Sequence, residues 1–211
     1  MDEIVWTKEY KLERYHGMNQ TAQKGAVLFA GSSLMEMFPV EQFAAEDNLP
    51  VTVYNRGVGG FITDELIENI AVCILELEPS KLFINIGTND LSDSTRSIAS
   101  VMANYAKILE TVKTTLPETQ IYLMAYYPVN YNAATEEMKP CLKIRSNEKI
   151  ALANAGVKQL AERFGAKYID VNAPLKDENG DLRAEYTIEG MHINEDGYRA
   201  VYPLVKPYIL E

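Results

Sequence analysis

Five short runs of almost uninterrupted apolar residues are spaced along this chain, and segments with helical periodicity separate them. The runs lie at residues 26–30, 51–55, 82–86, 121–126 and 166–171. A strand that is covered by helices on both faces needs apolar side chains on both faces, so its sequence shows a continuous run and not an alternation. The pattern predicts an α/β fold, a doubly wound three-layer sandwich with a five-stranded parallel sheet and helices on both faces.

The segments between these runs repeat their apolar residues at the spacing of an amphipathic helix, at residues 66–77, 98–112 and 150–164. Thr63 is a candidate N-cap for the first of them, and Gly165 is placed to end the third. A last helix is predicted from about Asn194 towards Val205, with Pro203 bending or shortening it.

We expect one domain over residues 1–211, in which residues 1–24 form an N-terminal helical segment that packs on the core. The formal net charge of -10 argues against a nucleic-acid backbone or an anionic membrane surface as a partner. The first residues lack the features of a signal peptide, and no window approaches the ~20 apolar residues of a membrane span. These features predict a cytoplasmic monomer or homodimer with no membrane span.

Three of the apolar runs end in short motifs: Gly-Ser-Ser at 31–33, Gly-Val-Gly-Gly at 57–60 and Gly-Thr-Asn-Asp at 87–90. A fourth motif, Glu-Gly-Met-His at 189–192, precedes the last predicted helix. Because the carboxyl ends of parallel strands meet at one edge of the sheet, where ligands bind in open α/β folds, we expect the motifs to converge.

Each motif alone has two interpretations. A serine that follows a strand and opens a helix suits a nucleophile, but it also suits a helix cap. The glycines at 57–60 suit an oxyanion-binding backbone, a plain turn or an incomplete nucleotide-binding loop. Asn89 suits an oxyanion donor or an ordinary polar turn. The chain has two histidines: His16 lies in the N-terminal segment, which is predicted to be helical, and His192 lies in a loop just before the last predicted helix, with Glu189 three residues earlier to orient its ring.

Together, in this order and rough spacing, the motifs resemble those of the SGNH hydrolases, also called the GDSL esterase/lipase family. That family has a strand-ending G-D-S, a downstream glycine, G-x-N-D and a C-terminal D-x-x-H. The resemblance spans residues 26 to 205. The sequence at 186–193, with Asn55-Arg56-Gly57, looks especially like the bacterial branch related to platelet-activating-factor acetylhydrolases.

The resemblance implies the flavodoxin-like SGNH hydrolase fold and a serine esterase that uses neither a metal nor an organic cofactor. Ser33 would be the nucleophile and, through its N–H, one oxyanion donor. Gly60, with Gly59 as the competing alignment, would give a second backbone N–H, and Asn89 would give its side-chain amide. His192 would be the general base, and the substrate a small ester of a glycan, lipid or alcohol.

The chain departs from the family pattern at two positions. Ser32 stands where the family has the Asp of G-D-S, and Glu189 stands where it has the triad Asp. The extra methylene of glutamate lengthens an arm on a spacing set for aspartate. We expect the loop to adjust so that Glu189 still orients His192; otherwise Glu189 points away and another group holds the ring.

Phe61, Tyr127 and Met191 are candidates for lining a substrate pocket, although such residues also serve in ordinary packing. The chain has no long apolar lid segment, which favours short acyl groups such as acetyl. Two other hypotheses stay open: a ligand-binding protein of this fold that has lost turnover because of Glu189, and a flavodoxin-like nucleotide binder that uses the glycines at 57–60.

Overall fold

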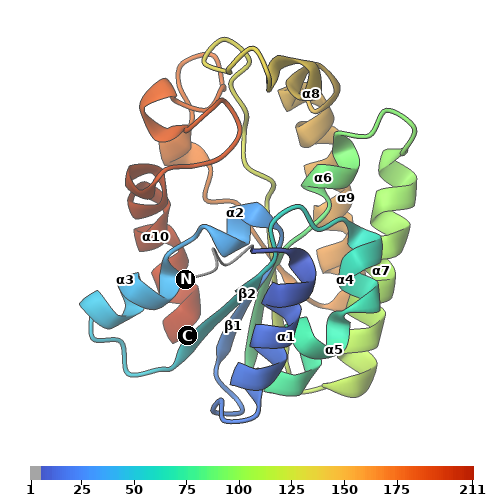
Figure 1. Cartoon of the computed structure of the whole chain (residues 1–211), viewed down its shortest axis with the longest axis vertical. Helices are drawn as coiled ribbons and strands as arrows, with labels where there is room; N and C mark the ends of the chain where they lie inside the picture. Colours follow the sequence, from blue (N-terminus) through green and yellow to red (C-terminus); the bar gives the residue numbers. More distant parts are fainter. Residues whose placement is uncertain (1–5) are drawn as a thin grey trace, which may run out of the picture.

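The computed structural model describes residues 6–211, and a parallel five-stranded sheet in the order β2-β1-β3-β4-β5 forms its centre (Figure 1). Its strands are β1 (Val27–Gly31), β2 (Val53–Gly57), β3 (Lys81–Asn85), β4 (Gln120–Met124) and β5 (Lys167–Ile169). All five predicted strands are present, and the predicted sandwich is confirmed. The bounds differ by a few residues because apolar runs continue into the loops at the strand ends.

Helices cover both faces of this sheet (Figure 1). On one face lie α2 (Ser33–Glu36), α3 (Val40–Glu46) and α10 (Glu195–Leu210). On the other lie α1 (Lys8–Asn19), α4 (Thr63–Glu68), α5 (Ile70–Cys73), α7 (Ile98–Thr115) and α9 (Asn147–Phe164). Two short helices, α6 (Thr88–Leu91) and α8 (Lys139–Ile144), and three 3-10 turns, η1 (Leu75–Leu77), η2 (Ala173–Leu175) and η3 (Ala184–Tyr186), lie in the connections.

The central strands bury both sets of their alternating side chains. In β1, Leu28 and Ala30 belong to the core under α4, α7 and α9, whereas Val27 and Phe29 belong to the core under α3 and α10. Phe29 stacks on Phe83 of the neighbouring strand, with ring centroids 4.6 Å apart. This double burial is the physical reason for the uninterrupted apolar runs in the sequence.

The first predicted helix differs from expectation. The segment is divided into α4, α5 and η1, and Asn69 lies at the break, where its amide donates to the Glu65 carbonyl. Thr63 is the first helical residue and not the N-cap. Its N–H and its hydroxyl both donate to the carboxylate of Asp90 on α6, so the start of α4 is capped by another segment of the chain.

The last helix is longer than predicted. It begins near Asn194 as predicted, and the Asn194 side chain caps it by accepting a hydrogen bond from the Gly197 N–H. The helix nevertheless continues past Pro203 and a second proline to Leu210. Its apolar face stays buried against the sheet over this length, and this packing outweighs the loss of backbone hydrogen bonds at the prolines.

The N-terminal helix α1 packs on the core through partly buried residues such as Leu12 and Tyr15. Of the predicted helical segment 1–24, residues 1–5 lie outside the described residues, as does the start of the chain that was inspected for a signal peptide. No helix within residues 6–211 is long and apolar enough to cross a membrane.

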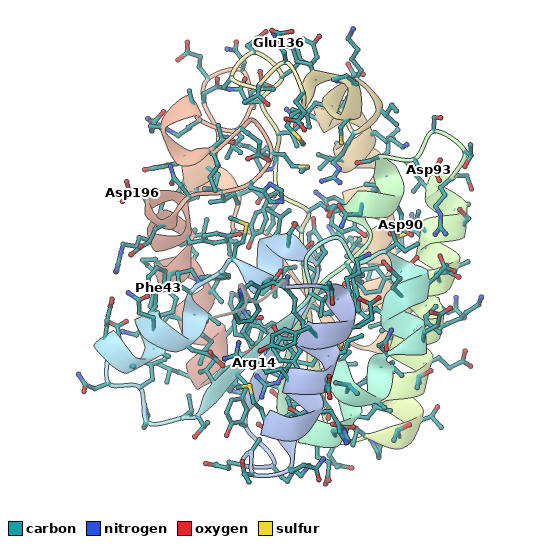
Figure 2. The ribbon with its side chains drawn as sticks, in the orientation of Figure 1. Arg14, Phe43, Asp90, Asp93, Glu136 and Asp196 are labelled. Atoms are coloured by element: carbon teal, nitrogen blue, oxygen red, sulfur yellow. The ribbon has the colours of Figure 1, made fainter. Side chains whose placement is uncertain are left out.

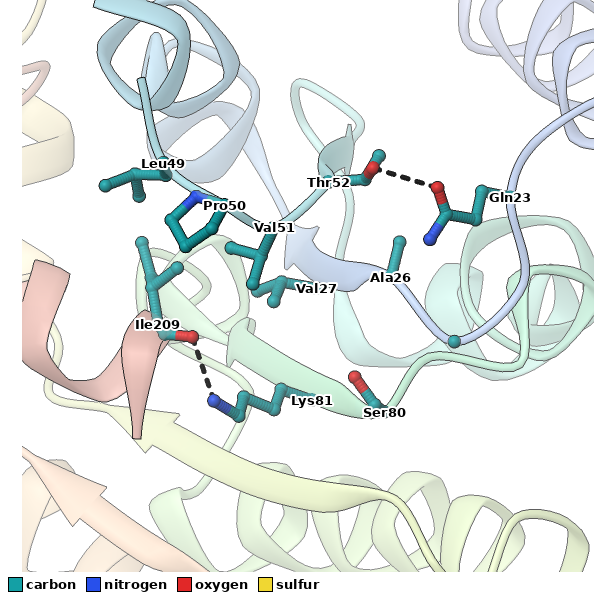
Figure 3. A pocket seen from close by; sticks show the side chains of 11 residues that line it. Gln23, Ala26, Val27, Leu49, Pro50, Val51, Thr52, Ser80, Lys81 and Ile209 are labelled. Atoms are coloured by element: carbon teal, nitrogen blue, oxygen red, sulfur yellow. Dashed lines mark hydrogen bonds between the residues drawn. The ribbon is translucent and has the colours of Figure 1, made fainter. Parts of the chain in front are cut away.

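The amino and carboxyl ends of the parallel strands have different surroundings. At the amino ends of β1 and β3 lies a hollow of about 400 Å³, where Lys81 donates to the Ile209 carbonyl at 2.8 Å (Figure 3). The four motifs lie at the opposite edge, where β1, β2 and β3 end. The four motifs and this hollow therefore lie at opposite ends of the strands.

Candidate active site

Ser33 and His192 meet at the carboxyl edge of the sheet, although 159 positions separate them in the sequence. The Oγ atom of Ser33 lies 2.9 Å from Nε2 of His192. Ser33 is the first residue of α2, directly after the end of β1. A second contact joins the same two segments. The Tyr198 hydroxyl of α10 donates to the Leu34 carbonyl at 2.7 Å, which ties the last helix to the segment that carries Ser33.

Ser32 is in a different environment. It occupies the N-cap position of α2, but its side chain makes no capping hydrogen bond. Its Oγ is fully buried and has no hydrogen-bond partner among residues 6–211. Ser32 therefore fits neither interpretation of the Gly-Ser-Ser motif. Its side chain does not cap α2 and makes no hydrogen bond with His192.

Glu189 reaches the imidazole of His192 despite its longer arm. Its Oε1 lies 2.5 Å from Nδ1 of the ring and also accepts the His192 backbone N–H at 3.3 Å. In the tautomer with the proton on Nδ1, this contact leaves Nε2 free to accept the Ser33 hydroxyl proton. The arrangement Glu189–His192–Ser33 has the connectivity of a catalytic triad.

The loop around Glu189 is tightly folded, and this fold accommodates the extra methylene. The Thr187 hydroxyl accepts from the Gly190 N–H at 2.8 Å and donates to the His192 carbonyl at 3.0 Å. Gly190 has a φ of +100°, and a Cβ there would lie 2.7 Å from the Asn130 carbonyl oxygen. Only glycine suits this position, where the loop presses against the segment that follows β4.

The two candidate glycines of the 57–60 loop differ in their hydrogen bonds. The Gly59 N–H donates to Oε2 of Glu36 at 2.7 Å. For the Gly60 N–H, no acceptor is found in the part of the chain that the structure describes. The geometry therefore favours the Gly60 N–H as the one available to a ligand.

Helix α1 holds this loop at three points. The Tyr15 hydroxyl donates to the Gly57 carbonyl at 2.8 Å, and the Lys8 ammonium donates to the Gly60 carbonyl at 3.0 Å. The third contact is indirect: Lys11 pairs with Glu36 at 2.6 Å, and Glu36 accepts the Gly59 N–H. The N-terminal helix thus fixes the backbone on which the Gly60 N–H depends.

Asn89 lies in α6 with both ends of its amide occupied by the protein. Its Nδ2 donates to the Phe61 carbonyl at 3.0 Å, and its Oδ1 accepts from Nη2 of Arg145 at 2.8 Å. An amide nitrogen carries two hydrogens, so one N–H of Asn89 is left for a ligand.

The neighbouring Asp90 has a structural role. Its buried carboxylate binds the start of α4 through Thr63 and pairs with Arg96 at 2.7 Å. Figure 2 shows Asp90 where α6 approaches α4. These contacts anchor α6, and with it Asn89, against the rest of the sheet edge.

The three predicted pocket residues are all buried. Phe61 and Met191 belong to the core on the α7 side, and Tyr127 belongs to the core on the α10 side. The Phe61 carbonyl and the Met191 sulfur contact Asn89 and Arg145 respectively, so two of the three adjoin the site. Their role in binding an acyl or sugar group stays a prediction.

Sequence reasoning missed Arg145, Glu36 and Lys11. Arg145 lies between α8 and α9 with a side chain that is almost completely buried, and burial lowers its pKa to about 10. No motif signals such a residue, because a buried arginine and an exposed one look the same in a single sequence.

A model of the GDSL-like Lipase/Acylhydrolase family matches residues 30–200. The chain belongs to the GDSL-like lipase/acylhydrolase family. It is therefore an ester hydrolase, and the resemblance inferred from the four motifs is confirmed. The match includes all four motifs and leaves out α1, which lies before its first residue.

Several solved structures share the fold. A Streptococcus pneumonia protein named for platelet activating factor is 30% identical, with a TM-score of 0.84 over 96% of this chain and 92% of that one. A GDSL-like lipase from Bacteroides thetaiotaomicron is 22% identical, with a TM-score of 0.77 over 94% and 97%. An acetylxylan esterase from Geobacillus stearothermophilus is 17% identical, with a TM-score of 0.67 over 89% and 95%.

One curated relative is much longer than this GDSL-like chain. An N-acylneuraminate cytidylyltransferase of Escherichia coli is 26% identical over 173 residues, which are 82% of this chain but 37% of the relative. The chain spans only about a third of that protein.

Proposed function

We propose that this GDSL-like hydrolase is a serine esterase that removes short acyl groups, such as acetyl, from a small alcohol, glycan or lipid. The observation that carries the proposal is the hydrogen-bonded series from Glu189 through His192 to the Ser33 hydroxyl. An acyl transfer needs a nucleophile with a base beside it and an oriented partner for that base, and this series supplies all three.

In the proposed reaction, Ser33 Oγ attacks the ester carbonyl carbon while His192 Nε2 takes the hydroxyl proton. The N–H groups of Ser33 and Gly60 and the Asn89 amide donate hydrogen bonds to the oxyanion of the tetrahedral intermediate. The carbon–oxygen bond to the alcohol then breaks, and His192 gives its proton to the leaving oxygen. A water activated by His192 cleaves the acyl-enzyme, which releases the acid and restores Ser33.

The preference for short acyl groups is testable with p-nitrophenyl esters from acetate to octanoate. Phe61, Met191 and Tyr127 are buried, so these three side chains expose little apolar surface to which a long acyl chain could bind. The name of the acetylxylan esterase among the structural relatives points in the same direction. We expect the highest kcat/KM for acetate and a steady fall with chain length; a maximum at octanoate would contradict the short-chain proposal.

A second candidate function is ligand binding without turnover, and one observation favours it. The second oxygen of the Glu189 carboxylate, Oε2, is buried with no hydrogen-bond partner in residues 6–211. A buried carboxylate oxygen without a hydrogen bond costs free energy. A carboxylate that is bonded through one oxygen is also held less firmly than one that is bonded through both. Covalent labelling of Ser33 by a fluorophosphonate together with ester turnover would reject this candidate, whereas failure of both would favour it.

The role of Glu189 predicts the effect of two substitutions. Glu189→Gln keeps the length but lacks the charge that stabilises the imidazolium, so kcat should fall by roughly 10³-fold. Glu189→Asp withdraws the oxygen from Nδ1 and should lower kcat by about tenfold, since the loop is built for the longer arm. Steady-state kinetics on p-nitrophenyl acetate measure both.

A matched control for these variants is Glu178→Gln, an exposed glutamate in a surface turn, which should leave kcat unchanged. A rise in kcat in Glu189→Asp would show instead that the native acid is poorly placed.

The proposed cytoplasmic location and the monomeric or homodimeric state are separate predictions. Cell fractionation tests the first, and analytical ultracentrifugation tests the second.

A further inference from the structure

Arg145 is a buried cation beside the proposed oxyanion donors. It follows α8, and only 3% of its surface is exposed. Its guanidinium donates to Ser92 Oγ at 2.7 Å, to Asn89 Oδ1 at 2.8 Å and to the Met191 sulfur at 2.7 Å. Each of these acceptors is neutral, and no carboxylate in residues 6–211 forms a salt bridge with it; Asp90 and Glu189 act on its charge only at longer range.

Such a site is energetically costly. A charged group that leaves water needs a compensating partner, and neutral acceptors compensate less than a carboxylate does. A hydrophobic residue of similar length would fill the same space without this cost. Packing alone therefore does not explain why a charged guanidinium occupies this position.

The contact with Asn89 supplies a reason. An asparagine amide has one end that accepts and one end that donates, and the two ends are nearly equal in shape. The guanidinium has only donors, so the end that faces Arg145 must be Oδ1. The donating end, Nδ2, then faces the opposite direction, where it meets the Phe61 carbonyl.

The hydrogen bond from Arg145 to Oδ1 also makes Nδ2 of Asn89 a stronger donor. A hydrogen bond from a cation to Oδ1 withdraws electron density from the amide, and hydrogen bonds in series polarise one another in a low-dielectric interior. The remaining N–H of Nδ2 becomes a better donor to a developing negative charge. A reversed amide would instead present its oxygen to that charge and repel it.

We propose that Arg145 is a positioning residue that orients and polarises the Asn89 amide so that Nδ2 serves as an oxyanion donor. This inference rests on the proposed function of the site. Arg145 acts through Asn89 and does not touch the reacting atoms.

The test is a double-mutant cycle with p-nitrophenyl acetate as the substrate. Arg145→Met should lower kcat by about 10²-fold, with KM changed less than about threefold, because the lost interaction serves the transition state. In an Asn89→Ala background, Arg145→Met should lower kcat by less than about threefold, since the amide that it orients is gone. Arg145→Lys should restore part of the activity, because an ammonium donates to Oδ1 but lacks the planar fork.

The double-mutant cycle separates this role from a structural one. If Arg145 only holds α8 and α9 in place, Arg145→Met will lower kcat by the same factor in both backgrounds, and that result overturns the inference. If Arg145→Met does not fold, the cycle is run with Arg145→Lys, and equal factors in both backgrounds again overturn it. Arg163→Met, which removes an exposed arginine from α9, is the matched control and should leave kcat unchanged.

Failure of the inference is distinguishable from failure of the proposed function. If Asn89→Ala alone leaves kcat unchanged, Asn89 is not an oxyanion donor, and both the assignment of the hole and the role of Arg145 are wrong. If Asn89→Ala lowers kcat while the effects of the two substitutions multiply independently, the proposed esterase mechanism stands and only the role of Arg145 is lost.

Discussion

Ser33→Ala should abolish turnover of p-nitrophenyl acetate, with kcat lowered by about 10⁴-fold or more. The Ser33 hydroxyl is hydrogen-bonded to His192 Nε2, and the alanine variant has no oxygen there to form the acyl-enzyme. The fold should be unaffected, because removing one hydroxyl leaves no cavity of consequence. Circular dichroism and thermal unfolding would verify that the inactive variant is folded.

Ser32→Ala is the matched control for this experiment. It removes a hydroxyl one position away that is buried and makes no hydrogen bond in the described chain. Removing an unpartnered buried hydroxyl is expected to be neutral or slightly stabilising, and activity should be retained. Substantial turnover in Ser33→Ala, or loss of turnover confined to Ser32→Ala, would reject Ser33 as the nucleophile.

Gly31→Ala should destabilise the protein by about 3–5 kcal/mol. Gly31 ends β1 with a φ of +151°, and a Cβ there would lie 2.0 Å from the Asn85 carbonyl oxygen of β3. That oxygen belongs to the backbone of a central strand and cannot move without breaking the sheet. We expect a large fall in the denaturant midpoint, or no folded protein, in urea unfolding followed by fluorescence.

The comparison variant is Gly17→Ala on α1. Outside its own turn of helix, no atom of residues 6–211 lies within 4 Å of the position of its Cβ, and alanine is the better helix former by about 1 kcal/mol. The denaturant midpoint should therefore stay the same or rise. A Gly31→Ala protein as stable as Gly17→Ala would show that β1 and β3 can separate at their carboxyl ends, contrary to the close approach described above.

The architecture was largely predictable from sequence because it depends on local patterns. A strand buried on both faces must be apolar throughout, so β1, β3 and β4 were visible as runs. The helix start near Asn194 and the helix end at Gly165 were visible because the signals for both lie within a single turn. Thr63 was assigned wrongly as a cap, because its real partner, Asp90, lies 27 residues away.

Part of the candidate site was likewise predictable from the sequence, and part of it was not. Three of the motifs were predictable as neighbours because each follows a strand, and the carboxyl ends of parallel strands lie on one side of the sheet. The fourth, at 189–192, precedes the last helix. The choice between Gly59 and Gly60 was not predictable, because it depends on Glu36, a residue of another segment that occupies the Gly59 N–H. Arg145 was missed for a similar reason: its burial and its contact with Asn89 arise only from tertiary packing.

The pairing of Ser33 with His192, and of Leu34 with Tyr198, has a consequence for the order in which the protein matures. During synthesis from the N-terminus, the proposed nucleophile and oxyanion groups are all present by residue 89, whereas the proposed base arrives about a hundred residues later. Contacts so distant in sequence are expected to form late, since their loop-closure entropy is offset only when the intervening elements have packed. If the proposed roles hold, an incomplete chain carries the serine without its base, and hydrolytic activity should begin only when the last helix has docked.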